Sequence, residues 1–265
     1  MVPVDFSQQS VWALSAAAML VKKKQGIIHI LYVVDSRVDT GKEALEKVKV
    51  DLYEFAQNYQ QKLGVSIIPN IEIGNVFQTI GEIAFRLGAK MIVMGTHGIK
   101  GIQKVIGSYA VRVMLGSKIP VLLIKDRFLS QSLSKIIIPI DNSTSFDIVI
   151  NKVIEPGQPF QGSVYLFSFL RDMSSFRKRK FIGKTERALK KIISAGFESK
   201  SILIQNNIQD FSDAIIRYAQ NINADIIAIP LQTKNPATEF QISDTALNLI
   251  IKAPFPLWII NPENI

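Results

Sequence analysis

The chain repeats itself, and this repeat constrains the fold more than any other feature of the sequence. Four apolar stretches of the first half return in the second half, in the same order and at a nearly constant offset: Val2–Ser7 as Ile138–Ser143, Ile27–Val34 as Ser163–Leu170, Ala89–Met94 as Ala224–Ile229, and Pro120–Ile124 as Pro256–Ile260. Solenoid repeats have periods of roughly 20–50 residues. A period this much longer indicates two tandem domains.

The boundary between the two copies falls in a polar segment, Asp126–Ser134, that separates two apolar runs. Linkers between domains are commonly polar and exposed. The sequence therefore predicts one domain at residues 1–127 and a second at residues 134–265. A length of 265 residues allows each copy a hydrophobic core of its own.

Within each half, short runs of β-branched residues alternate with helical patterns. In Leu45–Leu63 the apolar residues keep a helical period, and Gly64 follows as a C-cap. Val65–Ile73 is predicted to be a strand, and Phe77–Leu87 a helix. The apolar strands lack inside–outside alternation, which is typical of parallel sheets covered on both faces. We expect an α/β fold with two tandem doubly wound domains, each a five-stranded, mostly parallel sheet flanked by helices.

A glycine-rich loop follows one of these strands in the first half. The apolar run from Met91 ends at Gly95, Gly98 comes three residues later, and Gly107-Ser108 precede a new amphipathic run. Without Cβ atoms, the loop backbone can come close to a ligand. The free N–H groups and the positive dipole end of a helix start attract phosphate. The loop therefore predicts a nucleotide site.

The ends of other strands belong to the same prediction. In doubly wound sheets, ligands bind beyond the carboxyl ends of the strands, where the strand order reverses. Asp5, Val33 and Gly95 all lie at or near such ends. Asp5 has two interpretations that we weigh equally: it orients the base or a magnesium ion, or it is a turn or N-cap residue after the first strand.

The sequence resembles the universal stress protein family in its tandem two-domain form. The resemblance rests on Val2–Ser7, on Leu31–Asp35, and on Met91–Gly98 together with Gly107-Ser108. The ATP-binding members of that family carry two glycines around a dipeptide, a spacer, and a glycine followed by Ser or Thr. In this chain the spacer, Ile99–Ile106, is one residue shorter than in the family.

The resemblance implies a site for ATP or another adenine nucleotide in the first domain. If magnesium accompanies the nucleotide, Asp5 is the residue that we expect to hold it. The residues that the resemblance implies around the adenine and ribose are Pro3, Val4, Asp5, Val33, Met94 and Gly95. Those it implies at the phosphates are Gly98, Gly107, Ser108 and Tyr109. His97 lies inside the same loop, where a phosphate contact and a simple turn role are both open.

The second half departs from this pattern. Alignment of the neighbouring strands places Pro230, Thr233 and Ile242 where the first half has Gly95, Gly98 and Gly107. Proline removes an N–H donor, and the two other side chains add bulk. We therefore predict a degenerate second domain that does not bind ATP in this way.

The expected role of the second domain is to pair with the first. By the resemblance, the final strands Val121–Ile124 and Leu257–Ile260 pair within one chain, which would cover two apolar edges. Trp258 lies either at this contact between the two final strands or in the ordinary hydrophobic core of the second domain. Dimerisation between chains stays open.

The net charge of +9 suits an anionic partner. Much of it lies between Arg177 and Lys191. We favour the solvated face of a helix whose dry face carries Phe181, Leu189, Ile192 and Ile193. A nucleic-acid patch is the less favoured interpretation, because few aromatic residues interleave the charges.

Signals for catalysis and for a metal centre are weak. There is no Walker motif, no dinucleotide fingerprint and no nucleophile elbow. The chain has no cysteine, and its two histidines, His29 and His97, lie far apart; His29 is interpreted as a structural or edge residue of a strand. We expect a nucleotide-binding regulatory protein of the stress response with little or no turnover. A nucleotide-independent scaffold and a weak ATPase are the alternatives.

The apolar segment Val11–Val21 is too short to span a bilayer. No basic segment precedes it, as a signal peptide would require. The sequence alone therefore leads us to expect a cytoplasmic protein without a membrane partner.

Overall fold

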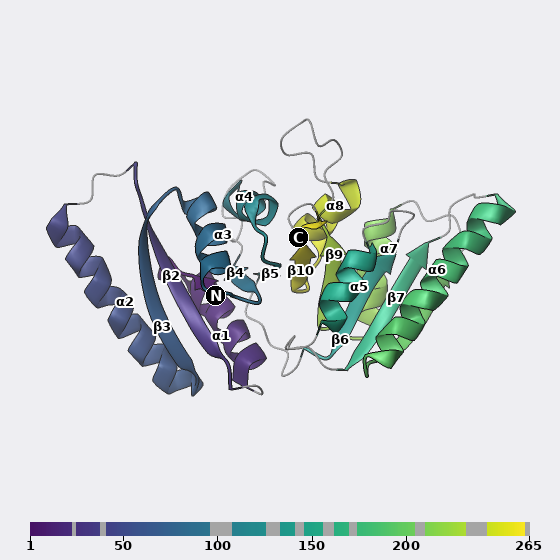
Figure 1. The fold of residues 1–265 in the computed structure, drawn as a ribbon, viewed down its shortest axis with the longest axis horizontal. Helices are drawn as coiled ribbons and strands as arrows, with labels where there is room; N and C mark the ends of the chain where they lie inside the picture. The colour runs from purple at the N-terminus through teal and green to yellow at the C-terminus, as the bar shows by residue number, and fades with distance from the viewer. Residues whose placement is uncertain are drawn as a thin grey trace. The chain divides into compact units, whose positions relative to one another are not determined.

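The computed structural model describes residues 1–22, 25–37, 41–95, 108–125, 133–140, 146–155, 162–169, 174–204, 210–231 and 243–262, with the backbone alone for Ser108 and Tyr109. It consists of two compact units, Met1–Leu129 and Ser130–Pro262, which are drawn in Figure 1 and described separately below.

The first unit alternates strands and helices. Its elements are β1 (Val2–Pro3), α1 (Gln8–Lys22), β2 (Ile27–Asp35), α2 (Lys42–Leu63), β3 (Ser66–Gly74), α3 (Val76–Arg86), β4 (Ile92–Gly95), α4 (Ser108–Gly116) and β5 (Val121–Ile124). The parallel pairs are β1–β2, β2–β3 and β4–β5. Met1 joins β1 to β4, because its carbonyl accepts from Val93 N at 2.9 Å and its amine donates to Met91 O at 2.8 Å. The strand order is therefore β3-β2-β1-β4-β5.

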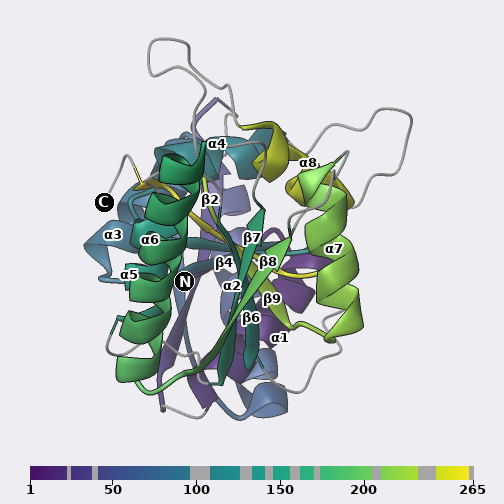
Figure 2. The same cartoon turned by 90° about the vertical axis from the view of Figure 1, so that its right-hand side faces the viewer.

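The second unit has the same architecture. Its elements are β6 (Lys135–Ile140), α5 (Phe146–Ile154), β7 (Ser163–Phe169), α6 (Ser175–Ser194), β8 (Glu198–Ile204), α7 (Phe211–Asn221), β9 (Ile226–Pro230), α8 (Asp244–Lys252) and β10 (Leu257–Ile260). The pairs β7–β8, β6–β7, β6–β9 and β9–β10 give the order β8-β7-β6-β9-β10. Figure 2 shows α5 and α6 on one face of this sheet and α7 and α8 on the other.

These two sheets confirm the predicted fold class. The strand pairs named above are all parallel, and in each unit the order reverses beside the first strand, which is the switch point of a doubly wound sheet. The local predictions hold as well: Gly64 ends α2 in the left-handed conformation, with its N–H bonded to Gln60 O at 2.9 Å. His29 lies opposite Ile68 of β3, and the pairing of β2 with β1 begins one residue later, at Ile30.

The strand registers establish which positions of the two units correspond. Pro3 lies opposite Leu31 in the first unit, and Pro139 lies opposite Phe167 in the second. Two residues further along each strand, Val33 therefore corresponds to Phe169.

The last two strands of each unit add a second equivalence. Gly95 lies opposite Ile124, and Pro230 lies opposite Ile260. Gly95 and Pro230 therefore occupy the same place, as the sequence alignment of the two halves predicts.

Candidate functional site

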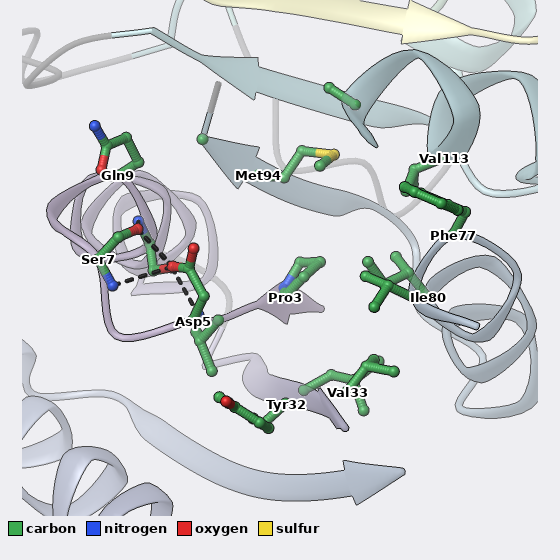
Figure 3. Close-up of a pocket in the computed structure, with 16 residues that line it drawn as sticks. Pro3, Asp5, Ser7, Gln9, Tyr32, Val33, Phe77, Ile80, Met94 and Val113 are labelled. Atoms are coloured by element: carbon green, nitrogen blue, oxygen red, sulfur yellow. Dashed lines mark hydrogen bonds between the residues drawn. The ribbon is translucent and has the colours of Figure 1, made fainter. Parts of the chain in front are cut away.

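A cavity of about 610 Å³ opens in the first unit at the carboxyl ends of β1, β2 and β4. Crossovers leave β1 and β4 toward opposite sides at this point, so the cavity lies at the switch point of the sheet. Figure 3 shows its lining, which comes from β1, β2, β4, the start of α1, and the facing helices α3 and α4.

Six of the residues predicted from the sequence line this cavity: Pro3, Val4, Asp5, Val33, Met94 and Gly95. The predicted phosphate residues His97, Gly98 and Gly107 lie outside the described residues, and so do the side chains of Ser108 and Tyr109. The structure thus brings together the part of the predicted site that comes from strand ends.

One wall of the cavity is apolar, and sequence reasoning missed most of it. Phe77 and Ile80 of α3 and Val113 of α4 face Val33 and Met94 across the cavity (Figure 3). The helical period of the sequence predicted α3, but it did not predict that the side chains of its first turn face the cavity. The one available signal was an N-cap type residue directly after a predicted strand.

That signal is Asn75, which accepts a hydrogen bond from Phe77 N at 3.1 Å. Asn75 is the single residue between the end of β3 at Gly74 and the start of α3 at Val76. As a result, the first turn of α3 lies at the carboxyl edge of the sheet and adds Val76 and Phe77 to the cavity lining.

The opposite end of the cavity is polar and belongs to the start of α1. Asp5 Oδ1 accepts hydrogen bonds from Ser7 N at 3.0 Å, from Ser7 Oγ at 2.5 Å and from Ser10 Oγ at 2.5 Å. Ser10 Oγ in turn accepts from Asp5 N at 3.0 Å, and Ser7 Oγ accepts from Ser10 N at 3.3 Å. Asp5 therefore has the turn role that the sequence offered as one of its two interpretations; the magnesium role stays a prediction.

Phe6, between these two polar residues, has an unusual backbone. Its φ is +61°, a left-handed conformation that costs most residues roughly 1–2 kcal/mol. Its ring stacks on Tyr32 at 5.2 Å between centroids and meets Phe55 of α2 edge-on at 5.5 Å. These aromatic contacts hold the turn, so that Asp5 and Ser7 both line the cavity.

Among the described residues, the second unit has little space at the corresponding place. A pocket of only about 30 Å³ lies there, lined in part by Pro139, Phe211 and Pro230. The ring of Phe211 stacks on Phe167 at 5.9 Å and on Phe169 at 5.7 Å. Phe211 begins α7 as Val76 begins α3, and Phe169 corresponds to Val33. Two aromatic rings of the second unit therefore occupy positions where the first unit has valines.

Ser243, which the sequence aligned with Ser108, has a structural role. Its hydroxyl accepts from Ala246 N at 3.3 Å and caps α8. Thr233 and Ile242, aligned with the two later glycines of the loop, lie outside the described residues.

The described residues contain no group of three or more His, Cys, Asp or Glu side chains placed to hold a metal ion. Among the helices in the described ranges, none has the length and hydropathy that crossing a bilayer requires.

Comparison with known proteins agrees with this architecture. Residues 1–125 match the family model described as the Universal stress protein family. A curated universal stress protein of Methanocaldococcus jannaschii is 27% identical over 143 residues, which cover 47% of this chain and 79% of that protein.

Two solved structures extend the comparison. The crystal structure of a universal stress protein from Archaeoglobus fulgidus covers 98% of this chain and 97% of its own, with a TM-score of 0.74 and 22% identity, and so shares the fold of both units. A second universal stress protein from Archaeoglobus fulgidus, solved in complex with dAMP, covers 48% of this chain at 19% identity and a TM-score of 0.38. The family match lies on the unit that holds the cavity, so residues 1–125 belong to the universal stress protein family, and both units share the fold of its members.

Proposed function

We propose that the first unit binds ATP or another adenine nucleotide in the cavity at the ends of β1, β2 and β4, and that the protein is a nucleotide-binding regulator of the stress response. The observation that carries this proposal is the contrast between the two units. The cavity measures about 610 Å³ in the first unit, against about 30 Å³ at the equivalent place in the second.

The size and lining of the cavity suit such a ligand. Small-molecule sites commonly have volumes of roughly 300–1,000 Å³, mostly apolar walls and a few polar groups that fix orientation. Here Val33, Ile80 and Met94 offer apolar walls to the faces of a purine, and Asp5 and Ser7 offer polar atoms at one end.

The position of α4 favours an anionic group on the ligand. This helix begins at Ser108, and Ala110 and Val113 of its first turns line the cavity. The N-terminal end of α4 therefore lies at the cavity. Backbone N–H groups and the helix dipole at such an end stabilise a phosphate.

Slow or absent turnover is part of the proposal. Asp5 is the only carboxylate among the described residues that line the cavity. Its Oδ1 already accepts three hydrogen bonds from Ser7 and Ser10, so this oxygen is engaged in the turn at the start of α1. Any magnesium that accompanies the nucleotide is proposed to bind near Asp5.

We further propose that residues 1–127 form the nucleotide-binding domain and residues 134–265 a degenerate partner domain. The aromatic filling by Phe167, Phe169 and Phe211 supports a structural role for the second unit. Pairing of the two units through β5 and β10, and a homodimer, remain proposals from the family resemblance.

The proposal is tested by isothermal titration with ATP, ADP, AMP and cyclic AMP, with and without magnesium. The decisive variant is Val33→Phe with Val76→Phe, which copies the rings of the second unit into the first. It is expected to fold, because the second unit accommodates the same rings, and to weaken binding about 100-fold or more. Ile68→Phe, at an exposed position of β3 (39% exposed), is the matched control and leaves binding unchanged.

Each outcome decides between the classes of function. If the wild type binds no nucleotide, the protein is a nucleotide-independent scaffold. Binding that survives the double variant puts the ligand outside the cavity and overturns the proposed site. Turnover that Asp5→Ala abolishes establishes the weak ATPase instead.

A further inference from the structure

Helix α6 carries an excess of positive charge that its counterpart in the first unit lacks. Its sequence, Ser175–Ser194, has eight basic residues and one acidic residue, a net charge of +7 out of +9 for the whole chain. Helix α2 stands between the second and third strands of its unit, as α6 does, and has four basic and four acidic residues. The two helices share a place in the repeat and differ by seven charges.

The difference in net charge between α6 and α2 shows whether a solvated helix at this position needs an excess of cations. The balanced surface of α2 shows that a solvated helix at this position of the fold does not require a net charge. A concentrated net charge on one helix repels itself and attracts polyanions. The charge of α6 therefore indicates an anionic partner, although the sequence pattern alone favoured a solvated face.

The cations lie on one exposed arc. The residues buried along α6 are Phe181, Thr185, Ala188 and Ile192. At 3.6 residues per turn, four exposed cations lie opposite them within an arc of about 100°: Arg179, Lys180, Arg187 and Lys190. Lys191 is also exposed, but its ammonium donates a hydrogen bond to Asn151 of α5 at 2.5 Å. Lys184, at the margin, forms an ion pair with Asp147 at 3.1 Å and points back toward α5.

Apolar side chains lie on or beside this arc and limit the choice of anion. Phe176 is 74% exposed and falls near its centre, and Ile193 is 51% exposed about 40° outside the arc. The sequence-based placement of Ile193 on the dry face was therefore wrong. Aromatic rings enter the headgroup region of a bilayer, and cations are attracted to its anionic lipids, so one bilayer surface can accommodate both kinds of side chain.

Nucleic acid fits this surface less well. The side chains that read adenine in the major groove are Asn and Gln, and α6 contains neither. A ligand that contacts α6 only through its phosphates would not be bound more tightly because of the apolar side chain of Ile193.

From these observations we infer that the exposed face of α6 binds reversibly to the surface of an anionic phospholipid bilayer, with Phe176 entering the headgroup region. Each Lys or Arg near such a surface strengthens binding about five-fold, so the four cations give roughly a 600-fold preference for anionic over neutral lipid. The attraction weakens as salt screens it. The inference does not depend on nucleotide binding.

The test is flotation of the full chain with lipid vesicles. We expect binding to phosphatidylcholine vesicles that contain about a third phosphatidylserine, no binding to pure phosphatidylcholine, and loss of binding between about 0.1 M and 0.5 M salt. Lys180→Gln with Arg187→Gln is expected to weaken binding about 25-fold, five-fold for each cation.

The matched control removes the same two charges from α2. Lys42→Gln with Lys47→Gln, both at exposed positions, leaves the net charge equal to that of the α6 variant and leaves vesicle binding unchanged. An equal loss in both variants means that net charge, rather than α6, attracts the vesicles, and overturns the inference.

Phe176→Ala distinguishes a bilayer from other anions at constant charge. It is expected to weaken vesicle binding several-fold with no change in thermal unfolding, because the ring is exposed. An oligonucleotide bound through α6 at about 0.1 M salt, with vesicles left unbound, overturns the inference in favour of nucleic acid.

Discussion

Gly95 packs against Gln9 so closely that no side chain fits between them. A Cβ built on Gly95 lies 2.7 Å from both the Cβ and the carbonyl oxygen of Gln9, at the start of α1. The glycine is therefore required by the packing of β4 on α1, besides lining the cavity. We expect Gly95→Ala to destabilise the first unit by about 1–3 kcal/mol, measured by urea unfolding.

The control for this prediction is Gly183→Ala on α6, where a Cβ meets nothing within 4 Å. A glycine inside a helix is less stable than alanine by roughly 0.5–1 kcal/mol. Gly183→Ala should therefore stabilise the protein. The two Gly→Ala substitutions should therefore change the free energy of unfolding in opposite directions. A change in the same direction for both contradicts the close packing at Gln9.

A second prediction concerns the strained turn at Phe6. Phe6→Ala removes two aromatic contacts, worth roughly 0.5–1.5 kcal/mol each, and keeps the left-handed backbone. Phe6→Gly removes the same contacts but also relieves the backbone, so it should be the more stable variant by about 1 kcal/mol. Urea unfolding of the two variants checks this order, and the reverse order shows that the turn is not strained.

A third prediction uses two equivalent helix caps that differ in charge. Asp210 caps α7 through Ser212 N at 2.8 Å, and Asn75 caps α3 through Phe77 N at 3.1 Å. The hydroxyl of Ser212, followed by the ammonium of Lys252, lowers the pKa of Asp210 to about 2 from its ordinary 3.8. A depressed folded pKa stabilises the protein above the unfolded pKa, and that stability is lost as pH falls.

Asp210→Ala should cost about 1 kcal/mol at neutral pH, and this cost should shrink as the pH falls from about 4 to about 2. Asn75→Ala should cost a similar amount at every pH, because an amide does not titrate. Urea midpoints at neutral and acid pH measure both. A pH-independent difference for Asp210 means that its charge adds nothing to the cap.

A fourth prediction concerns Ser10, whose buried hydroxyl joins both ends of the polar turn. Ser10→Ala leaves Asp5 N and Asp5 Oδ1 each without one hydrogen-bond partner, which costs about 1–3 kcal/mol. If Asp5 contacts the proposed nucleotide, the same variant also weakens binding in titration. Ser15→Ala, which removes one bond to Val11 O further along α1, is the control.

Much of the fold was predictable because its signals are local or repeated. Apolar strands without alternation, the helical period of Leu45–Leu63 and the C-cap at Gly64 each follow from short-range sequence patterns. The internal repeat then required the same topology twice, and the registers of Gly95 and Pro230 agree with it.

The candidate site was predictable only where it follows strand ends. Pro3, Val33 and Met94 meet at one edge because parallel strands end together. The wall from Phe77, Ile80 and Val113 was missed, because the period of a helix does not say which neighbour each side chain faces.

The sequence by itself determined the class of fold, the duplication and the strand ends around the cavity, since propensity, periodicity and capping act over a few residues. Only the tertiary structure decided that the first unit has a cavity of about 610 Å³, whereas the described residues of the second unit leave about 30 Å³ at the same place, beside Phe211, which stacks on Phe167 and Phe169. It likewise decided that Gly95 is needed against Gln9 and that Phe176 faces solvent among cations. Volume and exposure depend on which distant side chains meet, and that is settled only when the helices pack on the sheets.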